Sequence, residues 1–327
     1  MIWFTWRQHR AEALLTLGVL AVGSVYLLIT GLAMTHTFQD SGLGACLAQH
    51  PQSTDISGPC GVLASLFFNQ YNPFQLFAAA LLLLPILFGV LVGAPLIARE
   101  YEQRTSLLLW MQSVTRMRWL LVTLALVLGA GLLAAGILFA LLNWWFHPFD
   151  LLSGKFNQVA FDVTGPVFLA SSLMALAVAI AAGALTRRTV LALFLTLVLI
   201  AAIRIVVEFN LRPNYEPQVV VTWPFGQDSR PGGLEGTPPI TLGKEDWNLG
   251  SGFLDAQGNR TDGIRCNEPN PTSPLQCAQA SGYRGNYLAY QPASRFWTFQ
   301  LIETGIYLAI SILALSLTVW WVRKRLT

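Results

Sequence analysis

The sequence predicts an all-α, polytopic membrane protein with six transmembrane helices. Of its 327 residues, 54% are hydrophobic and only 11% are charged, whereas soluble domains carry about 25% charged residues. The mean hydropathy is +0.52, and the apolar residues are gathered in long continuous runs. One globular core would not hide so much apolar surface, but lipid solvates it. This composition argues against a soluble enzyme, a disordered chain and a nucleic-acid binder.

Each predicted span is a run long enough to cross the bilayer, for which a helix needs about 20 apolar residues. The runs are continuously apolar, unlike the alternating strands of a membrane barrel. The first is longer than the apolar part of a typical signal peptide, so we expect it to be a retained span. The six predicted spans are Ala13–Met34, Phe74–Ala98, Trp119–Trp145, Gly165–Leu185, Val190–Phe209 and Phe299–Val322.

The basic residues predict the orientation, because Lys and Arg concentrate in short cytoplasmic connections. The opposite short loops contain one basic residue, Lys155. Both termini are therefore expected in the cytoplasm, with the chain spanning the cell membrane. The basic residues assigned to the cytoplasmic side are Arg7, Arg10, Arg99, Arg104, Arg116, Arg118, Arg187, Arg188, Arg323, Lys324 and Arg325.

Residues 1–12 carry aromatic and basic side chains at helical spacing, among them Trp6, Arg7 and Arg10. This pattern is typical of a helix lying on the inner leaflet. A simple aromatic and basic anchor of the first span explains the same residues. Both interpretations stay open.

The four cysteines all fall in loops predicted to lie outside the cytoplasm, as disulfides require an oxidising compartment. We expect local bridges Cys46–Cys60 and Cys266–Cys277, with the two cross-loop connectivities as alternatives. Zinc held by Cys46 and His50 is a less favoured reading, because no second such pair exists. We expect no metal site.

The segment 210–298 holds more than half of the 17 prolines, together with many aromatic residues and one pair of cysteines. Loops of this length are usually functional or disordered. The cysteines and aromatics favour a small ordered extracytoplasmic domain. The predicted organisation is therefore an interfacial helix at 1–12, five spans within 13–209, the outer domain at 210–298, and the sixth span with a cytoplasmic tail at 299–327.

The cytoplasmic segment 99–118 has a charged start, a short apolar run and two possible helix caps, Thr105 or Ser106 and then Ser113 or Thr115. Two short helical pieces on the membrane surface fit this pattern. The simpler alternative is a basic loop held at the interface by Trp110.

Charged residues inside spans are costly and are candidates for function. Arg204 and Glu208 lie one helical turn apart in the fifth span and can pair, and Glu303 begins the sixth. The favoured interpretation is a structural ion pair near the outer interface. The alternative is a pair on a substrate pathway or at a gate.

No catalytic or nucleotide-binding motif is present in the sequence. The two Gly-Lys pairs, at Lys155 and Lys244, are followed by Phe156 and Glu245 rather than by Ser or Thr, so no Walker A loop is formed. We expect no catalysis and no cofactor in this chain. If transport uses ATP, then ATP and Mg²⁺ must bind to another chain.

The segment 99–118 resembles the permease subunits of type-2 ABC exporters, the drug and polysaccharide export class. The family tends to show a Glu, a Gly-Thr, a Leu-rich stretch and a Pro-hydrophobic-Ser-Arg element. Here Glu102, Arg104-Thr105, Leu107–Leu109 and Ser113-Val114-Thr115-Arg116 stand at those places, with Arg for the Gly and Ser for the Pro. The opening Trp-Arg-Gln-His-Arg and the Ala-Arg-Glu-Tyr-Glu stretch are similar to actinobacterial permeases.

The resemblance implies a cytoplasmic coupling helix that docks on a separate ABC ATPase. It also implies that a second permease, the same or a related chain, completes the pathway within membrane lipid. The residues that would contact the ATPase are Glu100, Glu102, Arg104, Thr105 and Arg116.

Two other classes of function stay open. A receptor or sensor would use the disulfide-bearing outer region to bind a ligand, although the small cytoplasmic part leaves little to pass on a signal. An ion-coupled carrier would use Arg204, Glu208 and Glu303, although no inverted repeat is evident.

Overall fold

The computed structural model describes residues 2–50, 58–102, 116–225, 239–265 and 274–325. The chain divides into two compact units. One is a helical unit formed by Met1–Arg212 and Thr298–Thr327, and the other is the unit Pro213–Trp297. The second unit occupies nearly the same residues as the outer domain predicted at 210–298. Each unit is described by itself.

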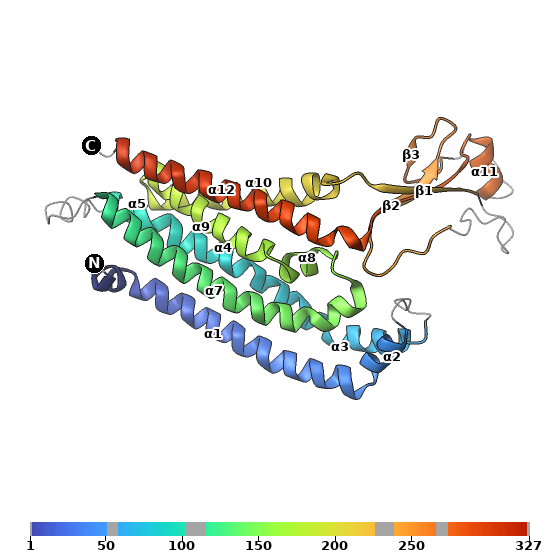
Figure 1. Cartoon of the computed structure of the whole chain (residues 1–327), viewed down its shortest axis with the longest axis horizontal. Helices are drawn as coiled ribbons and strands as arrows, with labels where there is room; N and C mark the ends of the chain where they lie inside the picture. The colour runs from blue at the N-terminus through green and yellow to red at the C-terminus, as the bar shows by residue number, and fades with distance from the viewer. Residues whose placement is uncertain (1, 51–57, 103–115, 226–238, 266–273, 326–327) are drawn as a thin grey trace. The chain divides into compact units, whose positions relative to one another are not determined.

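The helical unit is built from long helices joined by short ones (Figure 1). Two of the short segments, η2 and η3, are π-helices. The elements are α1 (Ile2–Asp40), α2 (Leu43–Gln49), α3 (Gly61–Ala80), η1 (Leu81–Leu83), α4 (Leu84–Phe88), η2 (Gly89–Gly93), α5 (Ala94–Glu102), α7 (Arg116–Ser153), α8 (Gln158–Thr164), α9 (Val167–Thr186), α10 (Thr189–Ile205), η3 (Val206–Leu211), η4 (Arg212–Asn214) and α12 (Phe296–Arg325).

Within the described part of the chain, five helical stretches are long and apolar enough to cross a membrane. They are Leu17–Asp40, Met117–Ser153, Val167–Thr186, Thr189–Asn214 and Ala293–Lys324. These confirm a polytopic, mostly helical membrane protein. The predicted second span, Phe74–Ala98, is not among them. Its residues are divided between α3, η1, α4, η2 and α5.

The irregular second span has a local cause in its sequence. Pro85 and Pro95 lack the backbone N–H that an α-helix bonds to the preceding turn, and Pro95 lies two residues after the π-helical Gly89–Gly93. The count of six spans therefore stays a prediction.

Helix α9 is the central helix of this unit. Its most apolar stretch is 83% buried, against 22% for α1, α7 and α10, and it contacts α5, α7, α10 and η2. The outer helices instead expose large apolar side chains such as Val22, Leu133 and Phe194. Exposed apolar surface of this extent fits contact with lipid rather than water.

Small residues let α9 approach η2 and α5 closely. A Cβ atom on Gly89 would lie 3.1 Å from the backbone of Ala175, and one on Gly93 would lie 3.0 Å from the Ala179 Cβ. A Cβ on Gly183 would collide with the carbonyl oxygen of Ala94. Gly-x-x-x-Gly spacing of this kind permits backbone contact between membrane helices.

Aromatic side chains fill the core between α1, α3 and α7. Phe67 and Phe149 have ring centroids 5.5 Å apart, and Trp145 stacks on Phe149 at 5.4 Å. The buried Trp145 indole N–H donates to Thr30 Oγ1 at 2.9 Å, so its polar atom is satisfied. Phe67, Trp145 and Phe149 are all buried, so these aromatics are core residues of the unit.

A disulfide joins Cys46 in α2 to Cys60, the residue before α3. This is the local bridge that we expected, and it leaves Cys46 without a thiolate to bind zinc beside His50. Cys277 is also disulfide-bonded. Its expected partner, Cys266, lies outside the described residues.

The unit Pro213–Trp297 contains a four-stranded antiparallel sheet in the order β1-β4-β2-β3. Its strands are β1 (Val219–Pro224), β2 (Trp247–Leu254), β3 (Arg260–Thr261) and β4 (Gly285–Gln291), and the short helix α11 spans Pro274–Ala280. The all-α class was therefore too narrow for the whole chain. The sheet depends on pairing of β1 with β4, which are distant in sequence, and local patterns do not reveal such pairing.

The predicted interfacial helix at 1–12 falls within α1, which is assigned as one helix from Ile2 to Asp40. That its first residues lie on the inner leaflet stays a prediction. The side chains of Trp6, Arg7 and Arg10 lie outside the described part. Both chain termini and the end of α5 lie at one end of the helical unit (Figure 1).

Candidate functional site: a charged cluster between α8, α10 and α12

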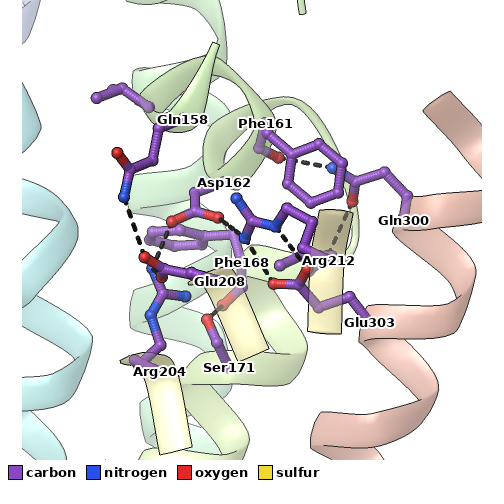
Figure 2. Close-up of polar contacts among 12 residues, drawn as sticks. Gln158, Phe161, Asp162, Phe168, Ser171, Arg204, Glu208, Arg212, Gln300 and Glu303 are labelled. Carbon is purple, nitrogen blue, oxygen red and sulfur yellow. Dashed lines mark hydrogen bonds and ion pairs between the residues drawn. The ribbon is translucent and has the colours of Figure 1, made fainter. Parts of the chain in front are cut away.

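Five charged side chains from separate segments meet inside the helical unit (Figure 2). We call Asp162, Arg204, Glu208, Arg212 and Glu303 the charged cluster. They come from α8, α10, η3, η4 and α12. Their side chains are at most 22% exposed, so the protein surrounds them on most sides.

Helix α8 holds its place in the cluster through its ends and its contact with α12. Asn157 Oδ1 accepts a hydrogen bond from the Val159 backbone N–H at 3.2 Å and caps the helix. The buried Gln300 amide donates from Nε2 to the Phe161 carbonyl at 2.6 Å. A Cβ atom on Gly165 would collide with Gln300, so glycine permits this close contact.

Arg212 is the most buried cation of the cluster, with a side chain only 4% exposed. Its Nε and Nη2 donate to the two carboxylate oxygens of Glu303 at 2.8 and 2.7 Å. Its Nη2 also donates to Asp162 Oδ1 at 2.9 Å, and its guanidinium lies 4.2 Å from the ring centroid of Phe161. Two-point contact of this kind is among the strongest for a carboxylate.

Glu303 is fully buried, and both of its carboxylate oxygens accept hydrogen bonds. In addition to Arg212, the hydroxyl of Tyr307 donates to Glu303 Oε1 at 3.2 Å. A buried carboxylate is stable only when it is paired and hydrogen-bonded in this way.

Arg204 joins the second half of the cluster. It donates to Asp162 Oδ2 and lies 2.5 Å from Glu208 Oε1, the i,i+4 pair that the sequence indicates. Gln158 Nε2 donates to the other oxygen, Glu208 Oε2, at 3.1 Å. Asp162 therefore bridges the two arginines.

The π-helical segment η3 brings Arg212 into the cluster. Its bonds span five residues instead of four, so the residues that follow are rotated relative to a continuing α-helix. Arg204, Glu208 and Arg212 thus all reach Asp162 or its partners. π-helical turns recur at functional sites for this reason.

The charged cluster carries one negative charge in excess, because three carboxylates face two guanidinium groups. Removing one guanidinium group from such a buried set leaves a carboxylate without its cation and typically costs about 3–5 kcal/mol. The cluster therefore fixes α8, α10 and α12 against one another, and any molecule that adds positive charge there would complete it.

Of the intramembrane residues that the sequence indicates, Arg204, Glu208 and Glu303 all lie in the cluster. Sequence reasoning missed Asp162, which was placed in a loop, and Arg212, which was placed in the outer segment. Each had a signal: Asp162 stands between Phe161 and Val163 in an apolar segment, and Arg212 follows Glu208 by four residues.

The expected ATPase-contacting residues are only partly described. Arg104 and Thr105 lie outside the described residues, as do the side chains of Glu100 and Arg116. Glu102, at the end of α5, accepts hydrogen bonds on Oε2 from Thr189 Oγ1 at 2.7 Å and from the Thr189 N–H at 3.1 Å. The Thr189 hydroxyl and backbone bonds hold the pKa of Glu102 below its usual range.

The five long apolar helices, with the charged cluster buried among them, are those of a polytopic membrane protein. A family model described as "ABC-2 membrane transporter related" matches residues 17–212, about three fifths of the chain. The chain belongs to this family. No curated protein and no solved structure matches it significantly. Membership makes it a component of membrane transport and implies partnership with ABC ATPase subunits.

Proposed function

We propose that this chain is the permease subunit of an ATP-driven exporter whose ATP and Mg²⁺ bind to a separate ABC ATPase. Family membership supports the permease role. The sequence carries no Walker A loop of its own, which supports a second chain as the source of energy.

The contact between Glu102 and Thr189 is the observation that carries this proposal. It ties the end of α5, where the expected coupling segment begins, to the first residue of α10. Helix α10 carries Arg204 near its other end, and η3 and η4, which follow it directly, carry Glu208 and Arg212. A displacement of α5 by the ATPase would therefore reach the charged cluster through one rigid helix.

The energetic requirement is a shift in population. ATP can drive the permease only if the ATP-bound ATPase stabilises one permease conformation over the other. Gly89 and Gly93 pack closely on α9, so a displacement of their segment would act directly on the backbone of α9.

The finer architecture belongs to the same proposal. It comprises six spans, cytoplasmic termini, an extracytoplasmic unit Pro213–Trp297 and a second permease. The chain would be a permease of actinobacterial type in a bacterial cell membrane. The chain termini and the end of α5 lie at one end of the helical unit (Figure 1), as a shared cytoplasmic face requires.

The test uses the permease copurified with its ATPase and reconstituted in lipid. Glu102→Ala removes both hydrogen bonds between the end of α5 and Thr189, and Thr189→Val removes the one from the hydroxyl. We expect each variant to lower stimulation of ATP hydrolysis by the permease at least fivefold. Assembly with the ATPase should persist. The control Thr37→Val removes a threonine hydroxyl that bonds to Tyr71 Oη at 2.7 Å in another part of the unit.

The pair of variants separates two roles for Glu102. If Glu102 acts by direct contact with the ATPase, then Glu102→Ala impairs stimulation and Thr189→Val does not. If neither variant changes stimulation, the proposed coupling route is wrong. The experiment is done at neutral pH, because a lowered pKa keeps Glu102 ionised until the pH falls through that lowered value.

A further inference from the structure

We infer that a cavity beside the charged cluster binds single-chain amphiphiles that carry a positively charged head group. The cavity has a volume of about 340 Å³ and lies between η1, α4, α9 and α10. That volume is within the range of small-molecule sites, about 300–1,000 Å³. This inference concerns binding alone and does not require the ATPase.

The lining of the cavity combines charged and apolar side chains. Asp162, Arg204 and Glu208 line one part of its wall, and apolar side chains from α4 and α10, such as Ile86 and Leu197, line most of the rest. An elongated molecule with a polar head and an apolar tail matches such a lining, because each part finds a similar environment.

The charge of the wall selects the sign of the head group. Asp162 and Glu208 against Arg204 leave one negative charge in excess, and the pairing of Arg212 with Glu303 does not change this balance. A cation completes the set, whereas an anion adds to the excess. In a medium of low dielectric constant this difference is much larger than in water.

Glu208 is the carboxylate with the weakest compensation. Asp162 and Glu303 each accept hydrogen bonds from a guanidinium on both oxygens or in two-point contact. Glu208 Oε2 instead accepts from the neutral amide of Gln158. Its Oε1 lies near Arg204 but is buried without a hydrogen bond of good geometry.

The cavity is bordered by side chains that face the outside of the helical unit. Leu83 and Leu197 are 54% and 50% exposed, and both line the cavity. In a membrane protein such exposed apolar side chains meet lipid, so an amphiphile would enter from the bilayer with its tail beside them. Water-soluble ions lack this route.

The test measures binding of decyltrimethylammonium to the purified chain in phosphatidylcholine nanodiscs, with empty nanodiscs as the baseline. Decyl sulfate and decyl maltoside, which share its tail, are the anionic and neutral comparisons. We expect the cation to bind at least tenfold more tightly than either. Glu208→Gln should reduce cation binding at least tenfold and leave binding of the neutral probe unchanged.

A second pair of variants locates the site. Ala201 lines the cavity and Ala202, its neighbour on α10, does not; both are exposed. Ala201→Phe fills the cavity and should abolish binding, whereas the matched Ala202→Phe should leave it intact. Equal binding by both variants, or equal affinity for decyl sulfate and the cation, would overturn the inference.

Discussion

Arg212 joins the two halves of the charged cluster. Its guanidinium contacts Asp162 and Glu303 and lies over the Phe161 ring, so it links α8 to α12 through one side chain. Asp162 in turn contacts Arg204. At the residue scale, α8, α10 and α12 are therefore linked by consecutive ion pairs, from Glu303 to Arg212, to Asp162 and to Arg204.

Replacing Arg212 should therefore cost far more than replacing an exposed arginine. We expect Arg212→Met to lower stability by about 3–5 kcal/mol, because Glu303 then stays buried without a cation. Arg323→Met, at an exposed position of α12, should change stability by less than about 0.5 kcal/mol. Thermal unfolding of each variant in detergent measures the difference.

The double variant Arg212→Met/Glu303→Met separates charge from packing. It removes both buried partners, so part of the lost stability should return. If the double variant is as unstable as the sum of the two single variants, the electrostatic explanation is contradicted.

At the scale of elements, backbone contact sets how α9 packs on the divided second span. Gly89 and Gly93 face Ala175 and Ala179, and Gly183 faces Ala94. Larger side chains at these positions would push the helices apart. The proposed coupling from α5 to α10 would then be interrupted. The same segment carries the π-helix at Gly89–Gly93, so close packing and irregular backbone occur together.

Gly183→Ala tests this packing. The added Cβ would meet the Ala94 carbonyl oxygen, and such overpacking typically costs about 1–3 kcal/mol. Gly136→Ala in α7 is the matched control, because an added Cβ there meets nothing within 4 Å. We expect a lowered melting temperature for Gly183→Ala alone, and equal melting temperatures would contradict the packing explanation.

At the scale of the whole molecule, the disulfide and the basic residues indicate opposite sides of the membrane for the regions that carry them. Cys46 and Cys60 are bonded, as an oxidising compartment permits. Arg118, near the start of α7, is exposed and belongs to the basic set predicted to be cytoplasmic. The proposed orientation requires that these two regions face opposite compartments.

Labelling with a membrane-impermeant maleimide checks the orientation. In a variant with serine at Cys266 and Cys277, we expect intact cells to be labelled at Cys46 and Cys60 only after reduction. In a cysteine-free background, Arg118→Cys should be labelled only after the cells are made permeable. Labelling of Arg118→Cys in intact cells would reverse the proposed topology.

Composition and the order of apolar runs were sufficient to predict the membrane class and most of the spans, because lipid imposes length and apolarity on each helix by itself. The same local reasoning paired Arg204 with Glu208, which lie four residues apart. It also placed Cys46 near Cys60.

Only the tertiary structure brought Asp162, Arg212 and Glu303 together, since their contacts join α8, η4 and α12 across long sequence separations. The same holds for the sheet of the unit Pro213–Trp297, whose strands pair across a long intervening segment. A span is determined by its own apolar length, whereas a buried charge is stable only where the fold supplies its partner.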